Sequence, residues 1–140
     1  MTTVDVERLM SSFLRGETDI TDLVGDRVYT ELPATKTWPL VRLTLIDESA
    51  VFDRPLYLTS SVIQIDAYGG AKVTAREIAD TIRSLLAHSF NGTHDFLGVV
   101  TGVSFTSMAY DPDESFQPAR PRYRFDVTVW AHPLPSNADS

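Results

Sequence analysis

The side chains best suited to catalysis or metal binding are few and scattered in this sequence. Its three histidines, His88, His94 and His132, lie far apart, and none forms the paired spacing on one helix that makes a metal site specific. An isolated histidine is usually structural or solvent-exposed, and we expect that role for all three. The chain contains no cysteine, so disulfide bonds, thiolate catalysis and thiolate zinc sites are excluded.

Sequence motifs for nucleotide binding and for hydrolysis are missing as well. The chain has no Gly-x-Ser-x-Gly elbow, no phosphate loop and no dinucleotide fingerprint. Gly69-Gly70 lies between a predicted strand and a predicted helix, but it lacks the third glycine and the lysine of those motifs. We interpret it as a turn. The sequence therefore predicts no catalytic residues, no metal and no cofactor, and we expect that the protein is not an enzyme.

A group of acidic side chains opens a loop that we predict over residues 111–121. These side chains are Asp111, Asp113 and Glu114. Carboxylates suit hard cations, but this loop lacks the further oxygen ligands and the central glycine of a calcium loop. We interpret the group as a solvated acidic loop.

Arginines gather directly after this loop, at Arg120, Arg122 and Arg124. In an extended chain Arg122 and Arg124 point to the same side, and Trp130 lies on that side further along. One interpretation is a solvated sheet face, since exposed arginines commonly contribute nothing measurable. The other is a protein interface, in which arginine pairs with carboxylates and the tryptophan is an aromatic anchor.

If the strip is an interface, its expected partner is the acidic loop around Asp113 in a neighbouring copy. Such a head-to-tail contact joins two different surfaces and can close into a ring. Gln64 and Asp66, on the outward side of the strand predicted over 58–68, are expected beside Arg122 and Arg124. Together these residues form the candidate interface.

Composition sets broad limits on the class of protein. The chain has 140 residues, of which 43% are hydrophobic and 22% charged, as expected for one soluble domain. Its formal net charge of −7 argues against tight binding to nucleic acid. The amino end lacks the basic residues of a signal peptide, and no apolar run approaches the ~20 residues that span a bilayer. We expect an intracellular product without a membrane anchor.

Hydrophobic periodicity predicts the elements that position these residues. Spacings of three and four predict helices over 4–14, 19–25 and 71–88. Alternation predicts strands over 27–32, 41–45, 58–68, 99–109 and 123–131. Residues 47–57 have no clean period and are predicted as a loop or the tip of a long hairpin.

The expected helix starts follow from capping residues. Thr2 or Thr3 is expected to cap the first helix, and Asp19 the second. Thr74-Ala75-Arg76-Glu77 matches a capping box, which would start the third helix three residues late. Glycines at Gly16 and Gly25 are expected to end the first two helices.

The order of elements predicts an α+β fold. We expect a largely antiparallel or mixed sheet of four to five strands, with two main helices packed on one of its faces. No internal repeat or long linker divides the sequence. One domain is therefore expected over residues 1–132, followed by a flexible C-terminal tail over 133–140.

Five segments carry a family resemblance that periodicity alone does not provide. They are Asp22-Leu23-Val24-Gly25-Asp26-Arg27-Val28-Tyr29, the loop with Pro33 and Trp38-Pro39 before Leu40-Val41-Arg42-Leu43, Val62-Ile63-Gln64-Ile65-Asp66-Ala67-Tyr68-Gly69, the helix with Ala75, Ile78, Ala79, Ile82 and Leu85, and Arg124-Phe125-Asp126-Val127-Thr128-Val129-Trp130. In order and spacing they resemble the tail terminator, or tail completion, proteins of long-tailed bacteriophages. The resemblance covers nearly the whole chain.

The resemblance implies a structural virion protein that caps the tail tube. It implies a homo-hexameric ring that ends tube growth and offers a docking surface to the head-tail connector. The implied partners are further copies, the major tail-tube protein and the connector (stopper) protein. The implied location is the tail-neck junction of the virion, after assembly in the host cytoplasm.

The acidic composition suits such a role. Six copies at −7 each would carry −42, and an acidic channel would repel phosphate, so that DNA would pass without specific binding. Two other classes stay open at this point. One is a different neck protein, such as a head-closure or adaptor component. The other is a small ligand-binding or enzymatic α+β domain, although the sequence offers no compact set of convergent polar residues for it.

Overall fold

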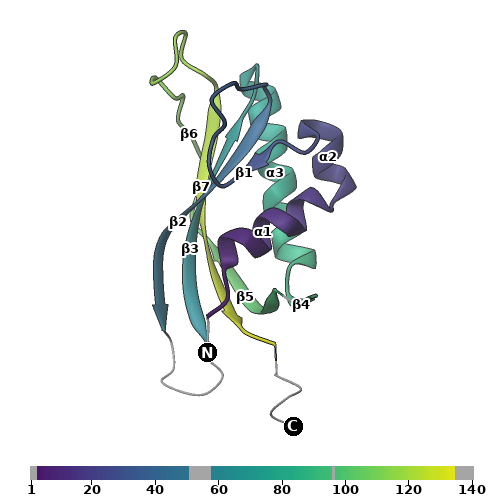
Figure 1. Cartoon of the computed structure of the whole chain (residues 1–140). Coiled ribbons are helices and arrows are strands. Elements are labelled where there is room, and N and C mark those ends of the chain that lie inside the picture. Colours follow the sequence, from purple (N-terminus) through teal and green to yellow (C-terminus); the bar gives the residue numbers. More distant parts are fainter. Residues whose placement is uncertain (1–2, 51–57, 96, 135–140) are drawn as a thin grey trace.

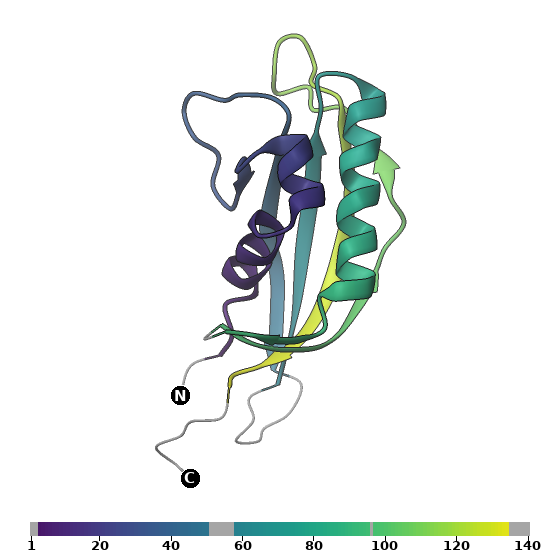
Figure 2. The same cartoon turned by 90° about the vertical axis from the view of Figure 1, so that its right-hand side faces the viewer.

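The computed structural model describes residues 3–50, 58–95 and 97–134. In these residues three helices pack on one face of a seven-stranded sheet (Figures 1 and 2). The helices are α1 (Val6–Arg15), α2 (Thr18–Val24) and α3 (Lys72–Ser89), and the strands are β1 (Val28–Tyr29), β2 (Leu40–Ala50), β3 (Thr59–Tyr68), β4 (Gly92–His94), β5 (Gly98–Phe105), β6 (Ala109–Tyr110) and β7 (Arg122–His132). The predicted α+β class is confirmed.

The sheet is mixed, but nearly all of its pairs are antiparallel. Its strand order is β1-β2-β3-β7-β5-β4, and β6 pairs with β7 beyond the end of β5. Only β1 and β2 run parallel among the described pairs. Four strands, β2, β3, β5 and β7, have eight residues or more, and the other three have two or three. The predicted four to five strands correspond to the long ones, because very short strands leave no periodic signal.

The core lies between the sheet and the helices. Ile63, Ile65 and Ala67 of β3 alternate inward and are fully buried, as the period of two predicts. On α3, Ile78 and Ile82 belong to the same buried cluster, so the predicted stripe of this helix faces the sheet. In the described residues the opposite face of the sheet carries no helix (Figure 1), so polar side chains are free to gather there.

The helices begin at residues other than the predicted caps. Asp5 caps α1, and its Oδ1 accepts a hydrogen bond from the Arg8 amide at 3.1 Å, so the expectation of a threonine cap was wrong. Glu17 precedes α2 without a side-chain cap bond, and Asp19 lies inside the first turn. The third helix starts at Lys72, and the Thr74 motif therefore lies within its first turns.

The second strand is longer than its alternation predicts. It pairs with β3 as far as Ala50 and Thr59, so residues 47–50 belong to a strand and not to a loop. A bulge between Leu45 and Asp47 shifts the register, which breaks the period of two and hides the strand in the sequence. The two strands thus form the long hairpin that was the alternative prediction. The rest of the predicted loop, residues 51–57, lies outside the described residues.

Gly69 is required where β3 meets α3. A Cβ atom at this position would lie 2.6 Å from the Ala75 amide nitrogen and 2.8 Å from the Ala71 carbonyl oxygen. Gly70 has nothing within 4 Å of such an atom. The predicted turn is therefore confirmed, and the close approach of the backbone to the first turn of α3 explains its first glycine.

Candidate functional site

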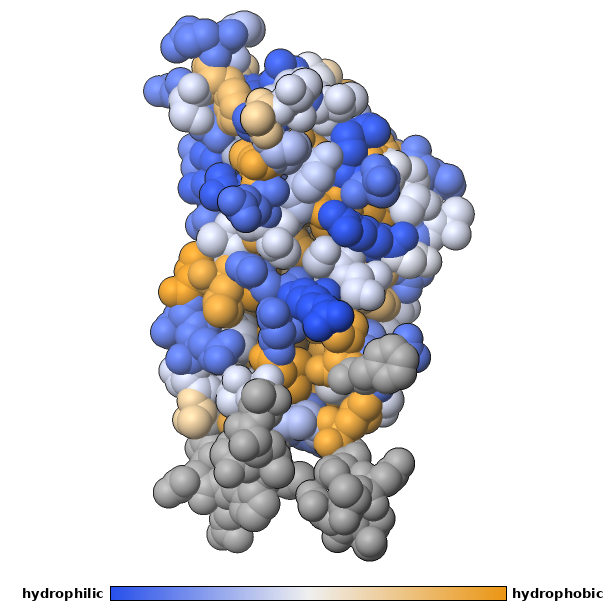
Figure 3. Space-filling model, viewed as in Figure 1, coloured by the Kyte–Doolittle hydropathy of each residue, from blue (hydrophilic) through white to orange (hydrophobic). Residues whose placement is uncertain are grey.

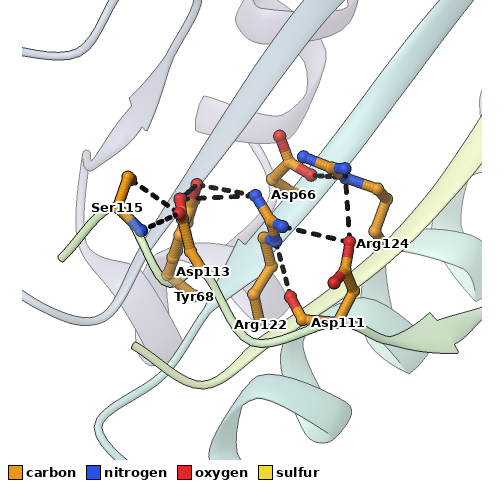
Figure 4. A network of polar contacts seen from close by, with 7 residues as sticks. All are labelled: Asp66, Tyr68, Asp111, Asp113, Ser115, Arg122 and Arg124. Carbon is orange, nitrogen blue, oxygen red and sulfur yellow. Dashed lines mark hydrogen bonds and ion pairs between the residues drawn. The ribbon is translucent and has the colours of Figure 1, made fainter. Parts of the chain in front are cut away.

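Five of the predicted interface residues meet on the helix-free face, at the end of β3 and β7. They are Asp66, Asp111, Asp113, Arg122 and Arg124, and they form one polar network with Tyr68 and Ser115 (Figure 4). The register of β3 and β7 places Asp66 opposite Arg124 and Tyr68 opposite Arg122. The expectation that Asp66 lies beside the arginines is thus confirmed.

Arg122 lies at the centre of this network. Its side chain is only 9% exposed, although an arginine at the start of a strand would ordinarily be solvated. Its Nε donates to the Asp111 carbonyl oxygen at 2.8 Å, and Nη2 donates to Asp111 Oδ2 at 3.1 Å. Its Nη1 donates to Asp113 Oδ2 at 3.3 Å and to the Tyr68 hydroxyl oxygen at 3.4 Å. The guanidinium therefore joins the 111–121 loop to the sheet.

Asp113 is fixed on both of its carboxylate oxygens. Its Oδ2 accepts from the Tyr68 hydroxyl at 2.7 Å, and its Oδ1 accepts from the Ser115 amide and hydroxyl at 3.0 and 2.6 Å. Burial alone would raise the pKa of Asp113, but the hydrogen bonds from Ser115 and Tyr68 and the nearby Arg122 outweigh it and lower this pKa to about 2. The carboxylate is therefore ionised at neutral pH.

The hydroxyl of Tyr68 is the matching donor. Burial, together with the hydrogen bond to Asp113, raises the pKa of Tyr68 to about 12. The phenol consequently keeps its proton at neutral pH. A protonated phenol and an ionised carboxylate form a stable pair, and neither of these two groups titrates near pH 7 as a general acid or base would.

Arg124 makes the second ion pair of the network. Its Nε donates to Asp66 Oδ1 at 2.6 Å, and Nη1 donates to Asp111 Oδ2 at 3.3 Å. The Asp66 side chain is only 3% exposed. Burial lowers the pKa of Arg124, but the hydrogen bond that Arg124 donates to Asp66 reverses this effect, so the pKa is raised above its ordinary value. Arg124 therefore neutralises a carboxylate that would be costly to bury alone.

These contacts change the expected pairing of the arginine strip. The acidic loop was expected to meet Arg122 and Arg124 of a neighbouring copy, whereas Asp111 and Asp113 pair with them inside one chain. Arg122 is also largely buried, so the interpretation of a solvated sheet face does not hold for this residue. The physical reason is the path of the loop, which folds back over the sheet and is held by the bridge between Asp113 and Arg120.

An aromatic cluster that the sequence analysis missed lies next to the network. The Trp38 ring centroid is 5.4 Å from that of Tyr68 and 5.2 Å from that of Phe116. The Arg120 guanidinium lies over the Trp38 ring, 4.4 Å from its centroid. The cluster joins the loop before β2 to the 111–121 loop. In the sequence, Trp38 was singled out only within the second resemblance segment, and no periodicity links it to Phe116.

The remaining predicted interface residues lie outside the network. Trp130 is half-buried near the other end of β7, opposite Ser60, so it is no neighbour of Arg122. Gln64 is half-buried between Thr44 and Asp126 on the same sheet face. Glu114 is exposed at the loop. Their role as interface residues stays a prediction.

The charged groups of the network are bound to one another. Each of its three carboxylates pairs with an arginine, and the described residues contain no group of three or more potential metal ligands. None of the three helices combines the length and hydropathy of a bilayer crossing within the part of the chain that is described. The arrangement fastens a loop to the end of a sheet and fixes the shape of that end.

Comparison with known proteins bears on the fold. No protein-family model matches the chain, and no curated protein matches it. Among solved structures, the chain is similar to a chain from the virion of a native gene transfer agent particle, with a TM-score of 0.68 and 17% sequence identity. The match covers 91% of this chain and 94% of the other. At this identity the two chains share a fold, and the shared fold spans nearly the full length of both.

Proposed function

We propose that the protein is a structural component of a phage-like virion, in which it forms a ring that caps the tail tube. The observation that carries the proposal is the shared fold with a chain of a gene transfer agent virion, over 91% of this chain. The resemblance of five ordered sequence segments to tail terminator proteins supports the same conclusion independently. Neither line of support depends on the other.

The physical character of the chain agrees with this role. A capping ring needs rigid surfaces at its two ends, and the arginine network and aromatic cluster fix the shape of one end of the sheet. The net charge of −7 disfavours tight contact with phosphate, as suits a ring through which DNA passes. The proposed partners are further copies in a hexamer, the tail-tube protein and the head-tail connector.

The nearest alternative is that the chain is a different protein of the virion neck. A head-closure or adaptor component would share the fold comparison and the acidic composition, but it would capture the connector and not the tail tube. A ligand-binding domain has weaker support, because the buried polar groups of the network are paired with one another and leave no converging set for a substrate.

Deletion of the gene from the particle-producing genome tests the proposal. A missing terminator leaves tube growth unchecked, so electron microscopy should show over-long tails without heads. Tails of normal length that fail to join heads would instead indicate the alternative neck role. Intact particles of normal length would overturn the proposal.

A further inference from the structure

The sheet has two outer edges that are only partly covered in the described residues. On one side, β1 pairs with β2 only at Val41 and Arg42. On the other side, β4 covers β5 only from Gly98 to Val100. Within the described part of the chain, residues 43–50 of β2 and 101–105 of β5 therefore have no strand partner on their outer sides. Open edges are templates for strand pairing with another chain.

The two edges differ in how they are protected. On β2, the Glu7 carboxylate accepts a hydrogen bond from the Leu45 amide at 2.6 Å, and a bulge and two acidic residues follow. Such features normally discourage uncontrolled edge pairing. The open part of β5 reads Thr-Gly-Val-Ser-Phe, without charge or proline. It is therefore the more receptive of the two edges.

The side chains beside the two edges are complementary. Along β2, Leu45 and Ile46 are 38% and 48% exposed, and the exposed acids Asp47 and Glu48 follow. Figure 3 shows hydrophobic surface over this part of β2. Such exposed apolar side chains next to charge are common at contact sites.

A hollow of about 530 Å³ lies next to the open part of β5, and its lining complements the exposed side chains of β2. Phe105 and Ala87 contribute apolar surface to it, and Arg76 and Arg83 contribute positive charge. Both arginines also pair with Asp80, which lines the same hollow. The hollow thus suits an apolar side chain followed by a carboxylate.

The complementary side chains of β2 and β5 also lie on the same face of the sheet. Leu45 lies opposite Ile63 and Glu48 opposite Ser61, and both of these β3 residues are buried beneath the helices. Leu45 and Glu48 therefore lie on the helix side of the sheet. Phe105 lies on that side too, since it is opposite the buried Val127. A strand β2 added alongside β5 would bring Leu45 and Glu48 to the hollow.

We propose that the open edge of β2 in one copy pairs with the open edge of β5 in the next, so that the sheet continues between copies. Each open edge therefore binds another copy of this chain. The contact joins two different surfaces, so it repeats head to tail and closes into a ring or extends as a filament. The proposal rests on the ring proposed above and specifies how its copies meet.

Paired cysteines test this contact directly, because the chain has no cysteine of its own. Ser49 and Ser104 are exposed, and each alternates with helix-side residues, so both lie on the helix-free side. Within one chain β3 and β7 separate them, which is about 14 Å at strand spacing and too far for a disulfide bond. The Ser49→Cys/Ser104→Cys variant, oxidised at high concentration, should give a ladder of covalent dimers, trimers and larger species.

Matched variants separate specific from random cross-linking. Each single-cysteine variant carries one thiol and can reach only a covalent dimer. The Thr35→Cys/Ser49→Cys variant has two exposed thiols but none on β5, and it should form the ladder severalfold more slowly. Equal ladders from both double variants, or no ladder from the Ser49/Ser104 pair, would overturn the proposal.

A charge exchange tests the same contact through its side chains. Glu48→Arg or Arg83→Glu in the Ser49/Ser104 cysteine background should reduce ladder formation severalfold, and the two changes together should restore it. Failure of the combined variant to recover would contradict the assignment of Glu48 to the hollow.

These outcomes are distinguishable from failure of the proposed function. A protein found at the tail neck that forms no ladder would retain its virion role and lose the edge contact. A protein that forms the ladder but is absent from particles would retain the contact and lose the virion role.

Discussion

Arg122 joins three separate segments, because it belongs to β7 and contacts both Tyr68 of β3 and the two aspartates, Asp111 and Asp113, of the loop before β7. A guanidinium is suited to this task, since its donors diverge in a rigid plane and it keeps its charge when buried. Its removal would leave the Asp113 carboxylate largely buried without its cation.

The Arg122→Met variant should therefore lower the free energy of unfolding by about 3 kcal/mol, the cost of breaking a buried pair on one side. Chemical denaturation monitored by tryptophan fluorescence measures the change. The Arg83→Met variant is the matched control, because its pair with Asp80 is about 40% exposed on both sides. It should cost under about 1 kcal/mol. Equal losses would contradict the central role of Arg122.

Acid should weaken the same network through Asp113. Its pKa is about 2 in the folded protein, against 3.8 for an ordinary aspartate, so folding favours the ionised form. The stabilisation is fully present above about pH 4 and is lost as the pH falls toward 2. The free energy of unfolding should therefore fall more steeply over this range in the native chain than in Asp113→Asn. If the free energy of unfolding falls equally in the native chain and in Asp113→Asn, the acid sensitivity does not arise from Asp113.

Part of this site could be predicted from residue types alone. Asp66 and Arg124 were placed together because both lie on outward positions of predicted strands, and they pair at 2.6 Å. The closure of Asp111 and Asp113 on Arg122 was not predictable, because periodicity does not describe the path of a loop. Tyr68 was missed for the same reason, since its partner Asp113 lies 45 residues away.

At the scale of the elements, regular apolar spacing predicted the long helices and strands, and local interruptions produced the errors. The last helix and the strands β3 and β7 follow the predicted periods, because one face of each packs on the core. The outer half of β2 was missed because it combines a bulge with six exposed positions from Leu45 to Ala50. Short strands such as β4 and β6 are defined by their partners and have no signal of their own.

The junction of β3 and α3 gives a prediction at this scale. Gly69→Ala should lower the free energy of unfolding by about 2 kcal/mol, because the new methyl group would overlap the first turn of α3. Gly70→Ala is the adjacent control and should change stability little, since nothing lies within 4 Å of its Cβ position. Thermal unfolding compares the two variants. Similar unfolding midpoints for both variants would show that the backbone of Gly69 does not lie in close contact with the first turn of α3.

At the scale of the whole molecule, the two faces of the sheet have different tasks. The helices complete the core on one face, while the other face carries the polar network at one end and Trp130 near the other end. The fold is shared with a virion chain over nearly its full length. The last strand, β7, ends at His132, and the domain boundary at residue 132 stays a prediction. Most of the predicted C-terminal tail, residues 135–140, lies outside the described residues.

Electron cryomicroscopy of the particles that carry this chain is the most direct measurement of the central claim. The proposed function predicts a ring of copies seated on the last layer of the tail tube, with the helix-bearing domain fitting each subunit. Density at that position that belongs to another protein, with this chain absent from the neck, would contradict it.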